Sequence, residues 1–297
     1  DNQLLILLSE SGSADTDATP NVILVAGKIS DGSSALGSNQ TFTSTTDGAK
    51  PAILSAATGD ANSDGTVDRL TLTFSESVVI TDPGTDDHIT LVASTGSASI
   101  SAASYGTTAS TLVYTITGAT ANNTSLTIAP TYATSGTGNI TDASSNEMLN
   151  GETVSGTDGA KPAILSAATG DANSDGTVDR LTLTFSESVV ITDPGTDDHI
   201  TLVASTGSAS ISAASYGTTA STLVYTITGA TANNTSLTIA PTYATSGTGN
   251  ITDASSNEML NGETVSGTDG AKPAILSAVT GDANSDGTVD RLTLTFS

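Results

Sequence analysis

The sequence predicts an all-β protein made of antiparallel β-sandwich domains in series, and three observations support this. Short runs such as Arg69–Phe74 (RLTLTF) alternate apolar and polar residues, as strands buried on one face do. No segment has the 3.6-residue period of a long helix. Residues 46–156 recur without any change as residues 157–267. This repeat is too long for a solenoid unit of roughly 20–50 residues, so we expect independently folded domains.

The strands within one repeat follow in short succession. After the alternating run RLTLTF, the segments TLVYTIT and SLTIA alternate in the same way. Adding AILSA, SVVIT, HITLVA, ASISAASY and GETVSG gives roughly seven or eight strands, separated by Gly, Pro, Asn and Asp turns. This number of strands predicts an immunoglobulin-like antiparallel sandwich with Greek-key connections.

The repeat also predicts the domain boundaries. Residues 1–45 resemble the second half of a diverged unit, because ISDGSS at Ile29–Ser34 corresponds to ITDASS at Ile140–Ser145. Residues 268–297 repeat the start of the unit with one change, Val279. We therefore expect a C-terminal half-repeat, two complete immunoglobulin-like repeats and the first strands of a third, at 1–45, 46–156, 157–267 and 268–297. The joint GTDGAKP (Gly156–Pro162) is a short linker, which restricts domain motion.

Composition narrows the class of partner. Thirty-one acidic and seven basic residues give a formal net charge of −24, which argues against nucleic acid or an anionic membrane surface and favours cations. The chain contains no cysteine, so a small core must rely on packing, hydrogen bonds or metal rather than on disulfides. It contains no 18-residue apolar run, so we expect no membrane span in this segment and any export signal or anchor outside it.

Three motifs of each repeat resemble the bacterial immunoglobulin-like domains of S-layer proteins and large surface adhesins. A proline opens a short strand at Pro51–Ser55, a strand runs into Phe-Ser-Glu within Leu70–Val78, and Asp-x-x-x-Asn precedes an apolar residue within Thr141–Leu149. The resemblance covers each full repeat. It implies a structural role at the cell surface rather than catalysis, although such domains serve as spacers, lattice tiles and adhesive tips.

The acidic loop GDANSDGTVD is the main candidate site. Oxygen donors spaced as D-x-N-x-D-G-x-x-D can wrap a hard cation, with a glycine for the tight turn and a threonine carbonyl available. We therefore predict a calcium site in each copy, with ligands Asp60, Asn62, Asp64, Thr66 and Asp68, then Asp171, Asn173, Asp175, Thr177 and Asp179, then Asp282, Asn284, Asp286, Thr288 and Asp290. The alternative is a solvated hairpin turn without metal, since Asn, Asp and Gly favour turns by themselves.

The loop resembles EF-hand and dockerin loops over its first nine positions only. Thr71 occupies the twelfth position, where a bidentate Glu is expected, and a strand follows instead of a helix. An EF-hand sensor works by moving two helices, so a sensor role is excluded. Calcium would instead offset the repulsion among the clustered acids and stabilise a domain that has few large apolar residues.

Other acidic residues are weaker candidates. Asp82, Asp86 and Asp87 form a second acidic stretch that fits a solvated turn better than a calcium site. Glu76 follows a predicted strand, and the resemblance implies that it sits near the calcium loop as a supplementary ligand.

Two further pairs of polar residues also have an ordinary structural explanation. Asp142 and Asn146 are expected to fix a loop by side-chain to backbone hydrogen bonds, with metal binding as the minor alternative. His88 and His199, the only histidines, have no cysteine or second histidine nearby, so we assign them no zinc or catalytic role.

These observations favour a structural protein. The sequence contains no nucleophile motif and no phosphate loop, so we expect no enzyme. Identical copies suit a role in which length or spacing matters, so we expect an extracellular segment of a cell-surface filament, S-layer or adhesin stalk, rigidified by calcium. Its partners would be copies of itself in a fibre or lattice. Two alternatives stay open for the half-repeats at 1–45 and 268–297: strand exchange that joins copies head to tail, or, as we favour, a sequence that is a window of a longer chain, in which case the half-repeats carry no meaning. The alternative is an adhesive module that binds a surface ligand or glycan.

Overall fold

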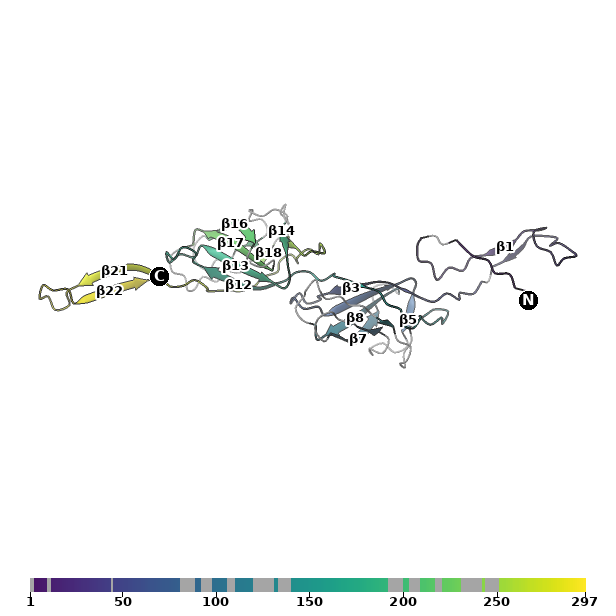
Figure 1. Cartoon of the computed structure of the whole chain (residues 1–297), viewed down its shortest axis with the longest axis horizontal. Coiled ribbons are helices and arrows are strands. Elements are labelled where there is room, and N and C mark those ends of the chain that lie inside the picture. The colour runs from purple at the N-terminus through teal and green to yellow at the C-terminus, as the bar shows by residue number, and fades with distance from the viewer. Residues whose placement is uncertain are drawn as a thin grey trace. The chain divides into compact units, whose positions relative to one another are not determined.

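The structure is a computed structural model, and it confirms an all-β fold (Figure 1). It describes residues 3–9, 12–43, 45–80, 89–91, 98–105, 110–119, 131–132, 140–191, 200–202, 209–216, 221–230, 242–243 and 251–297. Over these residues there is no helix. The contacts divide the chain into two compact units: unit 1 is 1–58, 69–118 and 127–157, and unit 2 is 59–68, 119–126 and 158–297.

Unit 1 contains an immunoglobulin-like sandwich. Its larger sheet has five strands in the order β11-β3-β4-β8-β7. These strands are β3 (Ile53–Gly59), β4 (Arg69–Phe74), β7 (Ser99–Tyr105), β8 (Thr111–Thr117) and β11 (Gly156–Thr157). Two short antiparallel pairs complete the fold, namely β5 (Val78–Ile80) with β10 (Ile140–Asp142), and β6 (Ile89–Thr90) with β9 (Thr131–Tyr132).

Unit 2 repeats this arrangement with the second copy of the sequence. The five-stranded sheet has the order β16-β17-β13-β12-β20. Its strands are β12 (Ile164–Gly170), β13 (Arg180–Phe185), β16 (Ser210–Tyr216), β17 (Thr222–Thr228) and β20 (Gly267–Thr268). The short pairs are β14 (Val190–Ile191) with β19 (Ile251–Thr252), and β15 (Ile200–Thr201) with β18 (Thr242–Tyr243).

Alternation along the strands builds the core, as the sequence predicts. In β4 the side chains of Leu70, Leu72 and Phe74 are buried, whereas Thr71 and Thr73 are half-buried. In unit 2 one cluster joins Leu181 and Leu183 of the large sheet to Ile191, Ile200 and Ile251 of the short pairs. The short pairs therefore pack on the large sheet and close the sandwich.

The last strand of each sheet departs from the expected antiparallel pattern. β11 pairs with β3 in parallel, and β20 pairs with β12 in the same way. Of the expected strand GETVSG (151–156), only the last residue, Gly156, belongs to β11. The second residue of β11 is Thr157, which is the first residue of the next sequence repeat. The expected strand SLTIA lies outside the described residues.

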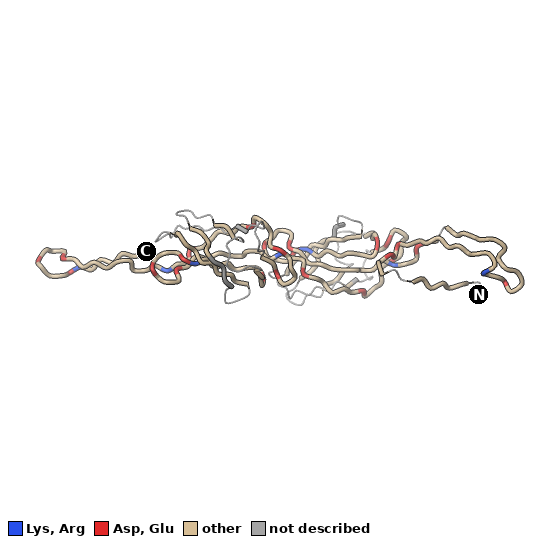
Figure 2. Tube along the Cα trace, turned by 90° about the horizontal axis from the view of Figure 1, so that it is seen from above, with Lys and Arg blue, Asp and Glu red and all other residues tan. Residues whose placement is uncertain are grey.

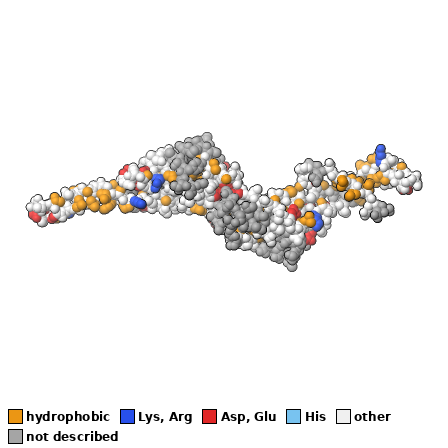
Figure 3. Space-filling model, viewed as in Figure 1, with side chains coloured by type: hydrophobic (Ala, Val, Ile, Leu, Met, Phe, Trp, Pro, Cys, Tyr) orange, Lys and Arg blue, Asp and Glu red, His pale blue; other side chains and the backbone are white. Residues whose placement is uncertain are grey.

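Two hairpins lie outside these sandwiches. In unit 1, β1 (Val22–Leu24) pairs with β2 (Gln40–Phe42). In unit 2, β21 (Ile275–Gly281) pairs with β22 (Arg291–Phe296). Both hairpins expose apolar side chains, which Figure 3 shows along β21–β22. Over the described residues, no helix is long and apolar enough to span a bilayer.

Candidate metal centres

The predicted calcium loop is the connection of the β3–β4 hairpin. β3 ends at Gly59 and β4 begins at Arg69, so the loop leads into a strand, as expected. The backbone takes a left-handed conformation at Ser63 (φ 59°) and at Gly65 (φ 85°). Glycine adopts this conformation without a steric cost, which explains its place in the motif.

Asp60 organises the first half of the loop. Its Oδ1 accepts hydrogen bonds from the backbone N–H groups of Ser63 (2.7 Å) and Asp64 (3.3 Å), and its Oδ2 accepts one from the N–H of Gly65 (2.7 Å). A carboxylate has about four acceptor positions, so one remains available for a cation. Asp60 thus shapes the loop and still keeps one acceptor position unused.

The other donors hold the second half of the loop. Asp64 Oδ1 accepts from the N–H of Thr66 (2.8 Å), and its Oδ2 accepts from Asn62 Nδ2 (3.0 Å). Asp68 Oδ1 accepts from the N–H of Ala61 (2.7 Å). These bonds stabilise the turn by themselves, which is the geometry expected of the alternative without metal.

The same network recurs in the second and third copies. Asp171 accepts from Ser174, Asp175 and Gly176, and Asp282 accepts from Asp286 and Gly287. The hydrogen bond from the N–H of Gly287 lowers the pKa of Asp282. Figure 2 shows acidic residues at the tip of the β21–β22 hairpin. The loop therefore forms even where no sandwich surrounds it.

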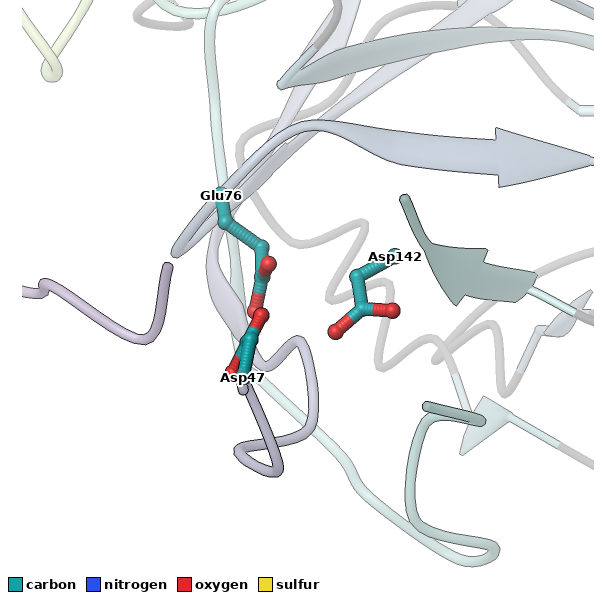
Figure 4. Close-up of side chains that lie close together, drawn as sticks. All are labelled: Asp47, Glu76 and Asp142. Atoms are coloured by element: carbon teal, nitrogen blue, oxygen red, sulfur yellow. The ribbon is translucent and has the colours of Figure 1, made fainter. Parts of the chain in front are cut away.

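A second acidic cluster lies in each sandwich, away from the loop (Figure 4). The carboxylates of Asp47, Glu76 and Asp142 each place an oxygen within 4.8 Å of the other two. Asp158, Glu187 and Asp253 do the same in unit 2. We call each set an acidic triad. Over the described part of the chain these are the sole groups of three such side chains this close, so the aspartates of the loops do not converge to the same degree.

Three separate segments supply each triad. In unit 1, Asp47 precedes β3, Glu76 lies between β4 and β5, and Asp142 ends β10. Figure 4 shows the carboxylates of Asp47 and Glu76 beside each other, with that of Asp142 across from them. Glu76 is 6% exposed and Asp142 is 2% exposed, so two acids of the triad are buried in the protein.

Asn146 fixes two of the three segments. Its backbone N–H donates to Asp142 Oδ1 (2.7 Å), and its Nδ2 donates to Asp142 Oδ2 (2.7 Å) and to the carbonyl of Asp47 (3.3 Å). Asn257 makes the same bonds to Asp253 and Asp158 in unit 2. The expectation that Asp142 and Asn146 fix a loop is therefore confirmed.

Burial and like charges shift the pKa values of the triad. In unit 2, burial first, and then Asp158 and Asp253, raise the pKa of Glu187 to about 8. In unit 1, burial raises the pKa of Glu76, and the hydroxyl of Thr16 lowers it in part. Burial acts to raise the pKa of Asp142 as well, but hydrogen bonds from Asn146, from the backbone of Ser144 and with Asp47 together outweigh it, and the net pKa is lowered. One acid of each triad is therefore costly to ionise without a cation.

The structure corrects the expected place of Glu76. Glu76 joins Asp47 and Asp142 instead of the calcium loop, because β4 separates it from residues 59–68. Asp82, Asp86 and Asp87, together with His88 and His199, lie outside the described residues.

The sequence contained a signal for the triad. Leu70, Leu72, Phe74, Glu76, Val78 and Ile80 are all buried, at every second position. Glu76 therefore continues the inward face of a strand, and Asp142 follows buried Ile140 in the same manner. An acid at an inward position needs a compensating partner, which singles it out. Asp47 gives no comparable signal, because it precedes the first strand.

Comparison with known proteins yields a likeness to solved structures alone. The sequence matches no protein-family model, and no curated protein matches it. The solved structures of surface layer protein SbsC, domains 1–6, and of the S-layer protein rSbsC(31–844) are similar with TM-scores of 0.31 and 0.30, at 12% and 14% identity. The chain aligns over 84% and 83% of its length and spans 32% of each of those chains.

A fragment of titin is also similar. The I-band fragment I67–I69 aligns with a TM-score of 0.23 and 8% identity, over 76% of this chain and 67% of the fragment.

Proposed function

We propose that this chain is a structural repeat segment of an extracellular surface structure, such as a filament, an S-layer or an adhesin stalk. The observation that carries the proposal is that two sandwiches of identical sequence follow each other along the chain with only a short linker between them. Thr157 ends β11 of unit 1, and Asp158 belongs to the triad of unit 2. Identical domains joined in this way suit a role in which length and spacing matter.

The proposal includes calcium in the three loops. Clustered aspartates in each loop keep free acceptor positions after their hydrogen bonds to the backbone, and calcium prefers such oxygen ligands. Bound calcium would stabilise the folded state by mass action, because an unfolded loop offers no preformed site. The test is thermal unfolding with calcium and with EGTA. A higher midpoint in calcium is expected, and an unchanged midpoint would refute a stabilising metal.

The proposal also includes association of copies of this chain. Support comes from the apolar face of β21–β22, where Leu292, Leu294 and Phe296 are 62%, 41% and 52% exposed. Over the described residues β21 and β22 form a two-stranded sheet, and the outer edge of such a sheet can accept a strand from another copy. Sedimentation of the 297-residue chain tests this: growth of the sedimentation coefficient with concentration is expected, and a monomer at every concentration contradicts strand exchange.

The surface location has its own test. Antibodies against the repeat, used in immunogold electron microscopy of intact producing cells, should label fibres, a lattice or a surface coat. Labelling confined to the cell interior would contradict the proposal.

A further inference from the structure

Two acids of each triad are buried, whereas the acids of a solvated surface are exposed. Glu76 Oε1 is buried and has no hydrogen-bond partner, although the side chain points at Asp47 and Asp142 (Figure 4). Glu76 is 6% exposed, so water cannot compensate its charge freely. A buried carboxylate oxygen of this kind needs a proton or a cation.

The arrangement is suited to a cation. Asn146 donates to both oxygens of Asp142 and to the carbonyl of Asp47, so it orients two ligand segments while leaving acceptor positions on each. Three carboxylates held by a second layer of hydrogen bonds resemble a preorganised site for a hard metal ion.

We propose that each triad is a calcium site, formed by Asp47, Glu76 and Asp142 in unit 1 and by Asp158, Glu187 and Asp253 in unit 2. Calcium accepts about six to eight oxygen ligands in a flexible geometry, which suits carboxylates contributed by three separate segments. Magnesium demands a regular octahedron and usually keeps several waters, so a site built from three protein carboxylates suits it less well.

The site would tie the start of each repeat to its own sandwich. Asp47 and Asp158 lie before the first strand of their domains, whereas the other two acids lie between β4 and β5 and at the end of β10, or at the matching positions of unit 2. A cation would therefore link three segments that are far apart in the sequence. These sites are separate from the loops, and the proposal does not depend on calcium in the loops.

Counting bound calcium tests this inference. The chain contains three loops and two triads, so equilibrium dialysis of the 297-residue chain at saturating calcium should give five ions per chain if both kinds of site bind. The double variant Glu76→Gln with Glu187→Gln removes one acid from each triad and should bind two ions fewer. A count of two in the parent and none in the variant supports the triads and refutes the loops. Equal counts in parent and variant overturn the triad proposal.

Three further measurements keep the test decisive. In EGTA the double variant should unfold at a midpoint at least as high as that of the parent, because the neutral amide relieves the buried charge. Asp47→Asn with Asp158→Asn should cause the same loss of two ions by removing a different ligand. Excess magnesium should not displace calcium from the triads, and complete displacement would contradict the choice of metal.

Discussion

Hairpins β12–β13 and β21–β22 have the same sequence except at one position, where Ala168 is replaced by Val279. Both pair in the same register, with the same irregularity after the first residue pair. Their burial differs completely: Leu181 and Leu183 are 0% exposed, whereas Leu292 and Leu294 are 62% and 41% exposed. The hairpin is therefore specified locally, but its core is supplied by strands from elsewhere in the sandwich.

The same contrast separates the two candidate metal centres. The loop forms in the sandwich hairpins and in β21–β22, because every ligand comes from one short segment. The triad needs three distant segments, and the described residues form it in the two sandwiches. The loop is thus a property of the local sequence, and the triad is a property of the complete domain.

The largest effect is expected from removing core side chains in the two contexts. Leu183→Ala should destabilise unit 2 by about 2–5 kcal/mol, because it deletes buried methyl groups and leaves a cavity. Leu294→Ala, at the same position of the exposed hairpin, should change stability by less than about 0.5 kcal/mol. Urea unfolding measures both, and unit 1 serves as an internal reference. Equal effects would show that β21–β22 is buried by a partner in solution.

The asparagine that orders the triad should have the next largest effect. Asn257→Ala removes the hydrogen bonds to Asp253 and to the carbonyl of Asp158, so we expect a loss of about 1–3 kcal/mol in unit 2. Asn284→Ala in the loop of the exposed hairpin removes two exposed hydrogen bonds with Asp286, one donated by Nδ2 and one accepted by Oδ1, and should cost far less. Urea unfolding in EGTA checks this. A similar cost at both positions would contradict a special role for the buried asparagine.

The strands and the sandwich could be predicted because alternation is a local signal. RLTLTF shows its inward face directly, since Leu70, Leu72 and Phe74 stand at every second residue. The parallel pairing of β11 with β3 could not be predicted, because nothing in GETVSG specifies its partner strand. Pairing between the two ends of a domain depends on the whole topology.

The loop and the triad differ in the same way. The loop was visible as a run of Asp, Asn and Gly, whereas the triad combines single acids from three places. Glu76 and Asp142 could have been found from their inward positions, but their approach to Asp47 depends on how the sandwich brings its segments together.

A smaller effect is expected from the leading aspartate of each loop. Asp171→Ala removes the acceptor of three backbone N–H groups, and Asp282→Ala makes the same change in β21–β22. By analogy with the loss of a side-chain cap at a helix N-terminus, where the aspartate makes similar bonds to backbone N–H groups, the cost is about 0.5–2 kcal/mol. Because the loop is local, both variants should lose protection from hydrogen exchange at the glycine amide, Gly176 or Gly287. Loss at Gly176 alone would show that the sandwich shapes the loop.

The smallest expected effect is a dependence of the stability of unit 2 on pH. It comes from a contact that β12 makes in the sandwich and that β21, its counterpart in the exposed hairpin, lacks over the described residues. Glu263 Oε1 accepts a hydrogen bond from the N–H of Ile164 at the start of β12, and burial raises the pKa of Glu263 to about 7 from its ordinary 4.5. The folded state then binds more protons than the unfolded state between these two values. Unit 2 should therefore lose stability as the pH rises from 5 to 8.

Glu263→Gln keeps an acceptor for the N–H of Ile164 and removes the titration. The variant should match the parent at pH 5 and exceed it by about 1 kcal/mol at pH 8, after allowance for partial exposure of the carboxyl. Urea unfolding in EGTA at the two pH values measures this, with Asp15→Asn as a control for the loss of one negative charge. A constant difference between variant and parent at both pH values would mean that Glu263 is ionised throughout. The N–H of Ile164 would then donate its hydrogen bond to a charged carboxylate, and this bond would stabilise the sandwich at every pH above 5.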